Sequence, residues 1–191
     1  KSGTIVNLTI DLQRYLMTEK INMIQAVPGT PYMGIEVPNT KRQMIRLADV
    51  VEKPEYTESK AILPMCLGVD TVGNPVVVDL AVAPHLLIAG TTGSGKSAGV
   101  NSMLVSLLLS RSPAELRLIM VDPKTVEFSQ YQGLPHLLTP IITDPESAVA
   151  ALRWLIKEQE RRYKLLSLLH TQNIAQCNAL IRSENAQGRK V

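Results

Sequence analysis

The eight residues Gly90-Thr91-Thr92-Gly93-Ser94-Gly95-Lys96-Ser97 constrain the fold of this chain more than any other segment. They fit the pattern G-x-x-x-x-G-K-[ST] at every fixed position. An apolar stretch, residues 85–89, precedes them, and residues 97–110 have helical character. A glycine-rich loop between a strand and a helix turns backbone N–H groups toward a phosphate, and the positive helix end adds to the attraction. The pattern therefore predicts a nucleotide-binding phosphate loop.

The loop pattern also predicts different roles for its residues. Residues 90–97 together contact the nucleotide, and Lys96 reaches the β- and γ-phosphates. The Ser97 hydroxyl is expected on Mg²⁺. ATP and Mg²⁺ are thus the expected cofactors, and Lys96 and Ser97 the expected catalytic residues.

Composition sets broad limits on the class of protein. The 191 residues suffice for one domain, or for one domain with a small appendage, and 45% of them are hydrophobic. A net charge of +3 permits a polyanionic partner without requiring one. Cys66 and Cys177 have no C-x-x-C spacing, so reduced thiols are expected instead of a zinc site or a disulfide framework.

The chain contains no apolar run that approaches the roughly 18 residues needed to cross a bilayer. It begins at Lys1 instead of a methionine and ends in a polar tract, so both ends look like cuts in a longer protein. We expect a soluble, cytoplasmic fragment.

The N-terminal part has the pattern of a small α+β subdomain. Apolar residues recur at helical spacing over 4–17, and strands are predicted at 21–27 and 32–37, joined through the Pro-Gly-Thr-Pro turn 28–31. The charged stretch 52–60 has the composition of a linker, which places a boundary near residue 57 and predicts subdomains 1–57 and 58–191.

A cluster of basic residues, Lys41, Arg42 and Arg46, lies near the end of this N-terminal part. The cluster fits a phosphate-facing patch, but a solvated charged face is the simpler interpretation.

The second part alternates strands and helices. A hairpin is predicted at 64–69 and 75–80, and further strands at 85–89, 116–121 and 138–142. This order predicts an α/β fold with a mostly parallel sheet. Asp144 is the expected cap of a long helix that ends near Leu169, on which Arg161 or Arg162 either reaches a neighbouring subunit's nucleotide or, more simply, forms surface salt bridges.

The carboxylates that an ATPase site also needs are less complete in this sequence than the phosphate-loop pattern. Residues 116–121 are a predicted strand that ends at Asp122, but Pro123 follows where a water-activating glutamate is usual. If Asp122 contributes indirectly to the Mg²⁺ shell, Glu127 is the nearest water-activating carboxylate. Alternatively, this strand is an intervening one, and the acidic strand lies beyond Val191.

Four spaced motifs lie along the second part of the chain: the segment 85–97, the Asp-Pro-Lys turn 122–124, Leu-Pro-His-Leu-Leu at 134–138 and Glu-Arg-Arg-Tyr at 160–163. Together they resemble the motor region of the FtsK/SpoIIIE family of DNA translocases. Residues 28–39 and 41–43 resemble the end of the family's small α subdomain, and 68–70 with 73–75 the entry to its RecA-like β subdomain. The resemblance covers nearly the whole chain.

This resemblance implies an ATP-driven pump for double-stranded DNA that serves chromosome segregation at cell division. It implies a homo-hexameric ring and a P-loop NTPase with a RecA-like sheet, truncated here before the family's Asp-Glu strand. The parent protein is expected to be membrane-anchored at the division septum. Because that strand is missing, the isolated fragment is expected to bind nucleotide weakly and hydrolyse little.

Two other functions stay open on the sequence alone. One is a secretion or conjugation ATPase of the same superfamily, which moves protein or single-stranded nucleic acid. The other is a nucleotide-binding module that orders a ring without catalysis.

Overall fold

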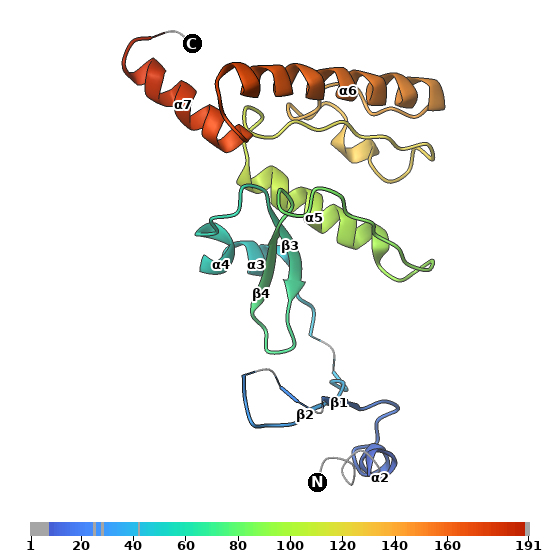
Figure 1. The fold of residues 1–191 in the computed structure, drawn as a ribbon. Coiled ribbons are helices and arrows are strands. Elements are labelled where there is room, and N and C mark those ends of the chain that lie inside the picture. Colours follow the sequence, from blue (N-terminus) through green and yellow to red (C-terminus); the bar gives the residue numbers. More distant parts are fainter. Residues whose placement is uncertain (1–7, 25, 28, 42, 190–191) are drawn as a thin grey trace. The chain divides into compact units, whose positions relative to one another are not determined.

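The structure, a computed structural model, describes residues 8–24, 26–27, 29–41 and 43–189 (Figure 1). The chain divides into two units, residues 1–46 and 47–191. The predicted boundary near residue 57 lies inside the second unit.

The first unit contains a helix and a small hairpin. Helix α2 (Thr9–Tyr15) lies within the predicted helix 4–17, whose residues 4–7 fall outside the described residues. Strands β1 (Asn22–Ile24) and β2 (Gly34–Glu36) pair antiparallel, with Met23 opposite Ile35. The predicted hairpin is confirmed with shorter strands, and Gly34 permits its close pairing, because an added Cβ would lie 3.3 Å from the Cβ of Ile24.

The second unit begins with two short helices that pack on a hairpin. Helices α3 (Leu47–Val51) and α4 (Pro54–Thr57) contact strands β3 (Pro64–Val69) and β4 (Pro75–Asp79), respectively. The two strands pair antiparallel, as predicted. The Asp70 carboxylate shapes the turn, since it accepts hydrogen bonds from the backbone N–H groups of Val72 and Asn74 at 2.9 and 2.8 Å.

The prediction that residues 52–60 are only a linker was wrong. Tyr56 of α4 is 8% exposed and packs in a cluster with Val50 and Cys66. Its hydroxyl donates a hydrogen bond to the Ser106 carbonyl of helix α5 (Lys96–Ser110). A single aromatic side chain thus gives a polar segment its place in the core, which is why the segment belongs with the second unit. A functional division at residue 57 stays a prediction.

Helix α5 follows the phosphate loop and packs on β3. Leu107 belongs to a second apolar cluster with Met65 and Leu116, and each of the three is no more than 8% exposed. Ser106 is fully buried, and its hydroxyl accepts a hydrogen bond from the Cys66 N–H at 3.0 Å. These contacts fix the helix on the hairpin and so fix the direction in which its N-terminus points.

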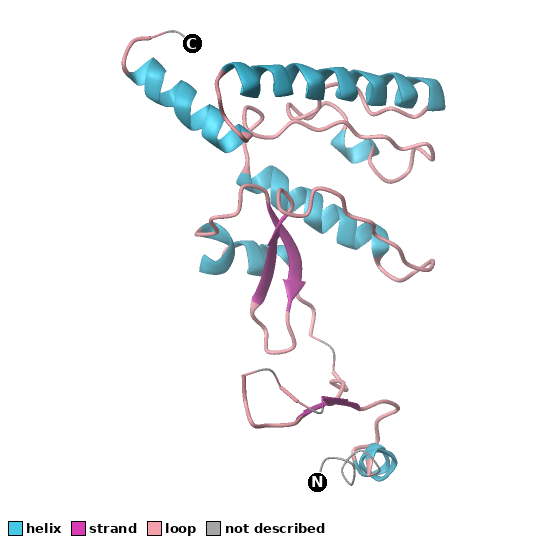
Figure 2. Cartoon of the chain, viewed as in Figure 1, coloured by secondary structure: helices cyan, strands magenta, loops and turns pink. Residues whose placement is uncertain are grey.

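The predicted parallel sheet is only partly formed. Among the described residues, the named strands make two antiparallel pairs, and Figure 2 shows residues 85–95 as loop. The other two predicted strands do run parallel, through bridges between Leu118 and Leu137 and between Val121 and Ile142. The ladder shifts register around Pro140, because proline has no N–H to donate.

The segment 85–89 is also apolar, yet it forms no strand in the described structure. Leu86 is 49% exposed and Leu87 is 92% exposed. A strand needs a partner for its backbone groups, and no neighbouring segment pairs with these residues in the described part of the chain.

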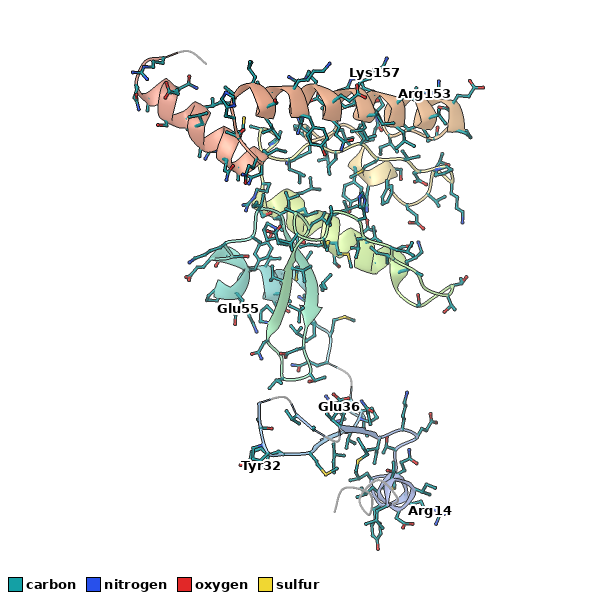
Figure 3. The ribbon with its side chains drawn as sticks, in the orientation of Figure 1. Arg14, Tyr32, Glu36, Glu55, Arg153 and Lys157 are labelled. Atoms are coloured by element: carbon teal, nitrogen blue, oxygen red, sulfur yellow. The ribbon has the colours of Figure 1, made fainter. Side chains whose placement is uncertain are left out.

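Two helices close the unit. Helix α6 (Pro145–Leu168) begins where the sequence predicts, since the Asp144 carboxylate accepts a hydrogen bond from the Ser147 N–H at 2.8 Å. Arg153 and Lys157 project from α6 (Figure 3). Helix α7 (Ile174–Ala186) was not predicted, although Asn173 caps it through the Gln176 N–H. No helix in the described ranges has the length and apolarity that a bilayer crossing requires.

Candidate functional site: the phosphate loop

The loop at residues 90–97 has a backbone that its glycines alone allow. Gly93 and Gly95 have φ angles of +79° and +87°, in the left-handed region that side chains with a Cβ rarely enter. At Gly90, an added Cβ would lie 2.4 Å from the Ser94 hydroxyl oxygen. The loop backbone therefore depends on glycine at 93 and 95, and at 90 a larger residue would displace the Ser94 side chain.

The loop leads directly into the N-terminus of α5. Gly95 is the N-cap residue and has no side chain with which to cap the first N–H groups of the helix. The first turn contains no acidic residue, so the positive end of the helix dipole is not neutralised within the helix itself. This arrangement favours an anion at the start of α5.

Lys96 and Ser97 converge on one oxygen atom. The Oε1 atom of Glu127 lies 3.4 Å from the Lys96 amino group and 3.2 Å from the Ser97 hydroxyl. The Lys96 and Glu127 side chains are 37% and 32% exposed, so the pair lies at the surface of the unit. A carboxylate oxygen thus stands where the same two donors would hold a phosphate oxygen, and the donor set fits a nucleotide phosphate.

Asp122, predicted to act indirectly on Mg²⁺, organises its own loop. It is 4% exposed, and its carboxylate accepts hydrogen bonds from the N–H groups of Glu127, Phe128 and Lys124 at 2.9, 3.0 and 3.2 Å. The Phe128 bond is the largest cause that lowers the pKa of Asp122 below its ordinary value, and the Glu127 bond also contributes. Among the described hydrogen bonds, Asp122 reaches the phosphate loop through Glu127.

A second pair of residues, which the sequence did not indicate, anchors the same loop. The Tyr131 hydroxyl donates a hydrogen bond of 2.8 Å to the side-chain oxygen of Asn101 on α5. Tyr131 is 5% exposed, and its ring lies 6.2 Å from that of Phe128. Asn101 stands four residues after Ser97, on the same helix face, and this spacing was the available signal.

The basic candidates on α6 form ion pairs within that helix. Arg161 and Arg162 both pair with Glu158 on α6, with shortest distances of 2.7 and 2.8 Å, and they lower the Glu158 pKa to about 2. This is the surface salt-bridge alternative, while a role toward a second subunit stays a prediction. Lys41 and Arg46 are exposed, and Arg42 lies outside the described residues.

Comparison with known proteins identifies the chain's relatives. Residues 46–191 match the FtsK/SpoIIIE family and residues 1–39 match the FtsK alpha domain. The chain is 50% identical over its full length to the protein named DNA translocase FtsK of Haemophilus influenzae, covering 36% of that protein. It is 47% identical to DNA translocase FtsK of Pseudomonas aeruginosa over 98% of the chain and 23% of the relative.

A solved structure of a conjugation protein also resembles the chain. This is the pCW3 conjugation coupling protein TcpA, in a monomer form with ATPγS. The TM-score is 0.58 at 25% identity, over 95% of this chain and 48% of that one. The chain spans about a fifth to a third of the length of the curated relatives it matches.

Proposed function

This chain belongs to the FtsK/SpoIIIE family, and from that membership we propose that it is the ATP-binding part of a translocase for double-stranded DNA. The names of relatives that are 47–50% identical over nearly all of the chain support this function. The proposed partners are duplex DNA and further copies of the chain in a hexameric ring.

The observation that carries the proposal is the convergence of Lys96 and Ser97 on one anionic oxygen at the start of α5. We assign residues 90–97 to the triphosphate, with the loop amides around it and Lys96 on the β- and γ-phosphates. Mg²⁺, when bound, would neutralise the charge that develops on the phosphate oxygens. The Ser97 hydroxyl would hold it, with Asp122 acting indirectly.

The proposed architecture is a RecA-like, mostly parallel sheet. The parallel bridges at Leu118 and Val121 support it, as does the strand-like composition of residues 85–89. In this proposal, residues 85–89 form a strand once a neighbouring strand pairs with them.

The experiment that tests this function measures ATP turnover in a full-length protein that contains the chain, with and without duplex DNA. Duplex DNA should stimulate turnover, and Lys96→Ala should abolish it, because the lysine charge is needed at the phosphates. The 191-residue chain alone should bind nucleotide weakly and turn over little ATP. A robust rate from this chain alone, abolished by Lys96→Ala, would contradict the last expectation.

A second candidate function has one specific observation in its favour. The structural likeness to a conjugation coupling protein fits an ATPase that acts on DNA transferred between cells. Comparison of DNA forms separates the two candidates: a duplex translocase is stimulated by double strands, whereas preferential stimulation by single strands would favour the conjugation alternative.

A further inference from the structure

Glu127 lies where a nucleotide phosphate is proposed to bind. Its Oε1 atom lies within hydrogen-bonding distance of the Ser97 hydroxyl, at 3.2 Å, and pairs with the Lys96 amino group at 3.4 Å. These are the side chains assigned above to the triphosphate and its metal. A phosphate oxygen that contacted Lys96 and Ser97 together would lie where the Oε1 atom of Glu127 lies, so such binding requires that Glu127 move.

The position of Glu127 is built into the fold at its N-terminal side. Asp122 is nearly fully buried and holds the backbone N–H of Glu127 at 2.9 Å and that of Phe128 at 3.0 Å. Thr125, between them, has a φ of +59°, a left-handed conformation that a β-branched residue rarely adopts. The Asp122 hydrogen bonds thus hold the loop in a turn that the chain would otherwise disfavour.

The loop is also held on its C-terminal side. The buried Tyr131 hydroxyl bonds to Asn101, one helical turn beyond Ser97 on α5. Residues 122–131 therefore lie along the first turns of α5 and are fixed on both sides of Glu127. An unconstrained surface glutamate would sample many rotamers, whereas this backbone delivers the carboxylate to the phosphate loop.

We propose that Glu127 is an internal competitor for the phosphate site, and that Asp122 is the residue that positions it there. The proposal rests on the proposed function, since it concerns regulation of the same nucleotide site. In the nucleotide-free protein, Glu127 neutralises Lys96 and occupies the Ser97 hydroxyl. A triphosphate displaces it because several phosphate oxygens and the loop amides outcompete one carboxylate. The conformation of the 122–128 loop therefore depends on whether the phosphate site is occupied.

The test measures the affinity of the full chain for a fluorescent ATPγS derivative, once with Mg²⁺ and once in EDTA. Glu127→Gln keeps the size of the side chain but removes its charge. It should tighten binding about twofold to fivefold in both conditions, the range expected for loss of a partly exposed ion pair. Glu160→Gln, the same charge change at an exposed position of α6, should leave the affinity unchanged.

The outcomes separate this proposal from its alternatives. Unchanged or weaker binding of Glu127→Gln in EDTA would overturn the competitor role. Weakening in Mg²⁺ alone would instead make Glu127 a ligand of the metal. In a Lys96→Ala background, the gain from Glu127→Gln should shrink, because the competing pair no longer exists. If Lys96→Ala itself leaves ATPγS binding unchanged, the proposed function fails, whatever Glu127 does.

A further variant tests the positioning role of Asp122. Asp122→Asn replaces an acceptor oxygen with a donor and should loosen the loop, giving part of the Glu127→Gln gain and faster amide hydrogen exchange at residues 124–128. Combined with Glu127→Gln, it should add nothing to the affinity. An equal additional gain in the double variant would show that Asp122 does not act through Glu127.

Discussion

At the scale of single residues, a glycine of the phosphate loop and a glycine of α5 differ in the space that an added Cβ would have. Gly90 has the Ser94 hydroxyl where its Cβ would be, whereas an added Cβ at Gly99 would have nothing within 4 Å. The same substitution therefore has opposite consequences at the two positions. A comparison of the two glycine-to-alanine substitutions therefore isolates the effect of the space around each residue.

We expect Gly90→Ala to weaken ATPγS binding by about threefold, the equivalent of about 0.7 kcal/mol, because the Ser94 side chain must turn away from its place in the loop to admit the methyl group. Gly99→Ala should leave binding unchanged and raise the free energy of unfolding by about 0.5–1 kcal/mol, since alanine is favoured over glycine inside a helix. Nucleotide titration and urea denaturation measure the two effects. Equal affinity of Gly90→Ala and the parent chain would contradict this role of the Ser94 side chain.

At the scale of elements, α4 shows how one side chain assigns a segment to a unit. Without Tyr56, the segment 52–60 would consist largely of charged and polar residues. With it, α4 joins the cluster of Val50 and Cys66 and bonds to α5. The unit that carries the phosphate loop thus includes residues that composition assigns to a linker.

Tyr56→Ala should lower the free energy of unfolding of the second unit by about 3 kcal/mol, through lost apolar burial and a cavity. Tyr56→Phe, which removes only the hydroxyl, should cost about 1 kcal/mol. Glu55→Ala on the same helix is the matched control, because Glu55 is exposed and its substitution should have little effect (Figure 3). Urea denaturation measures all three, and a Tyr56→Ala variant as stable as the parent would restore the linker interpretation.

The start of α6 depends on pH through its capping residue. The hydrogen bond from the Ser147 N–H is the main cause that lowers the pKa of Asp144 below its ordinary value. The folded state therefore favours the carboxylate, and the stabilisation is complete above the unfolded pKa of about 3.9 and is lost as pH falls through the lower, folded pKa. The protection factor of the 147 amide, which is corrected for the pH dependence of intrinsic exchange, should fall as the pH falls below about 4. In Asp144→Asn this loss of protection should disappear, and its persistence would assign it to another group.

At the scale of the whole molecule, all residues assigned to the nucleotide belong to the second unit. Helices α3 and α4, the β3–β4 hairpin and α5 form its main packed body, and the two described apolar clusters join these elements to one another and to Leu116. The hydrogen bonds described around Lys96 and Glu127 join residues of the second unit to one another.

A chain of residues 47–191 should therefore bind ATPγS with an affinity within about twofold of the 1–191 chain, since separate units contribute additively. Fluorescence titration of both chains measures this, with circular dichroism to verify that the shorter chain keeps its helices. Loss of binding in a folded 47–191 chain would show that the first unit contributes to the site.

The sequence by itself determined the phosphate loop, the two hairpins and the capped start of α6. Each depends on residues close in the chain: glycines that permit a left-handed turn, Asp70 in its loop, and Asp144 bonded three residues ahead. Local hydrogen bonds and backbone sterics leave few alternatives at such places, so the residue pattern is sufficient.

Only the tertiary structure decided which residues distant in the sequence contact one another. It placed Glu127 on Lys96, 31 residues away, and Tyr56 on Ser106, 50 residues away. It also left residues 85–89 without a strand partner in the described chain, although their composition is that of a strand. Strand pairing and side-chain burial depend on which distant segments contact one another, and no local sequence pattern indicates those contacts.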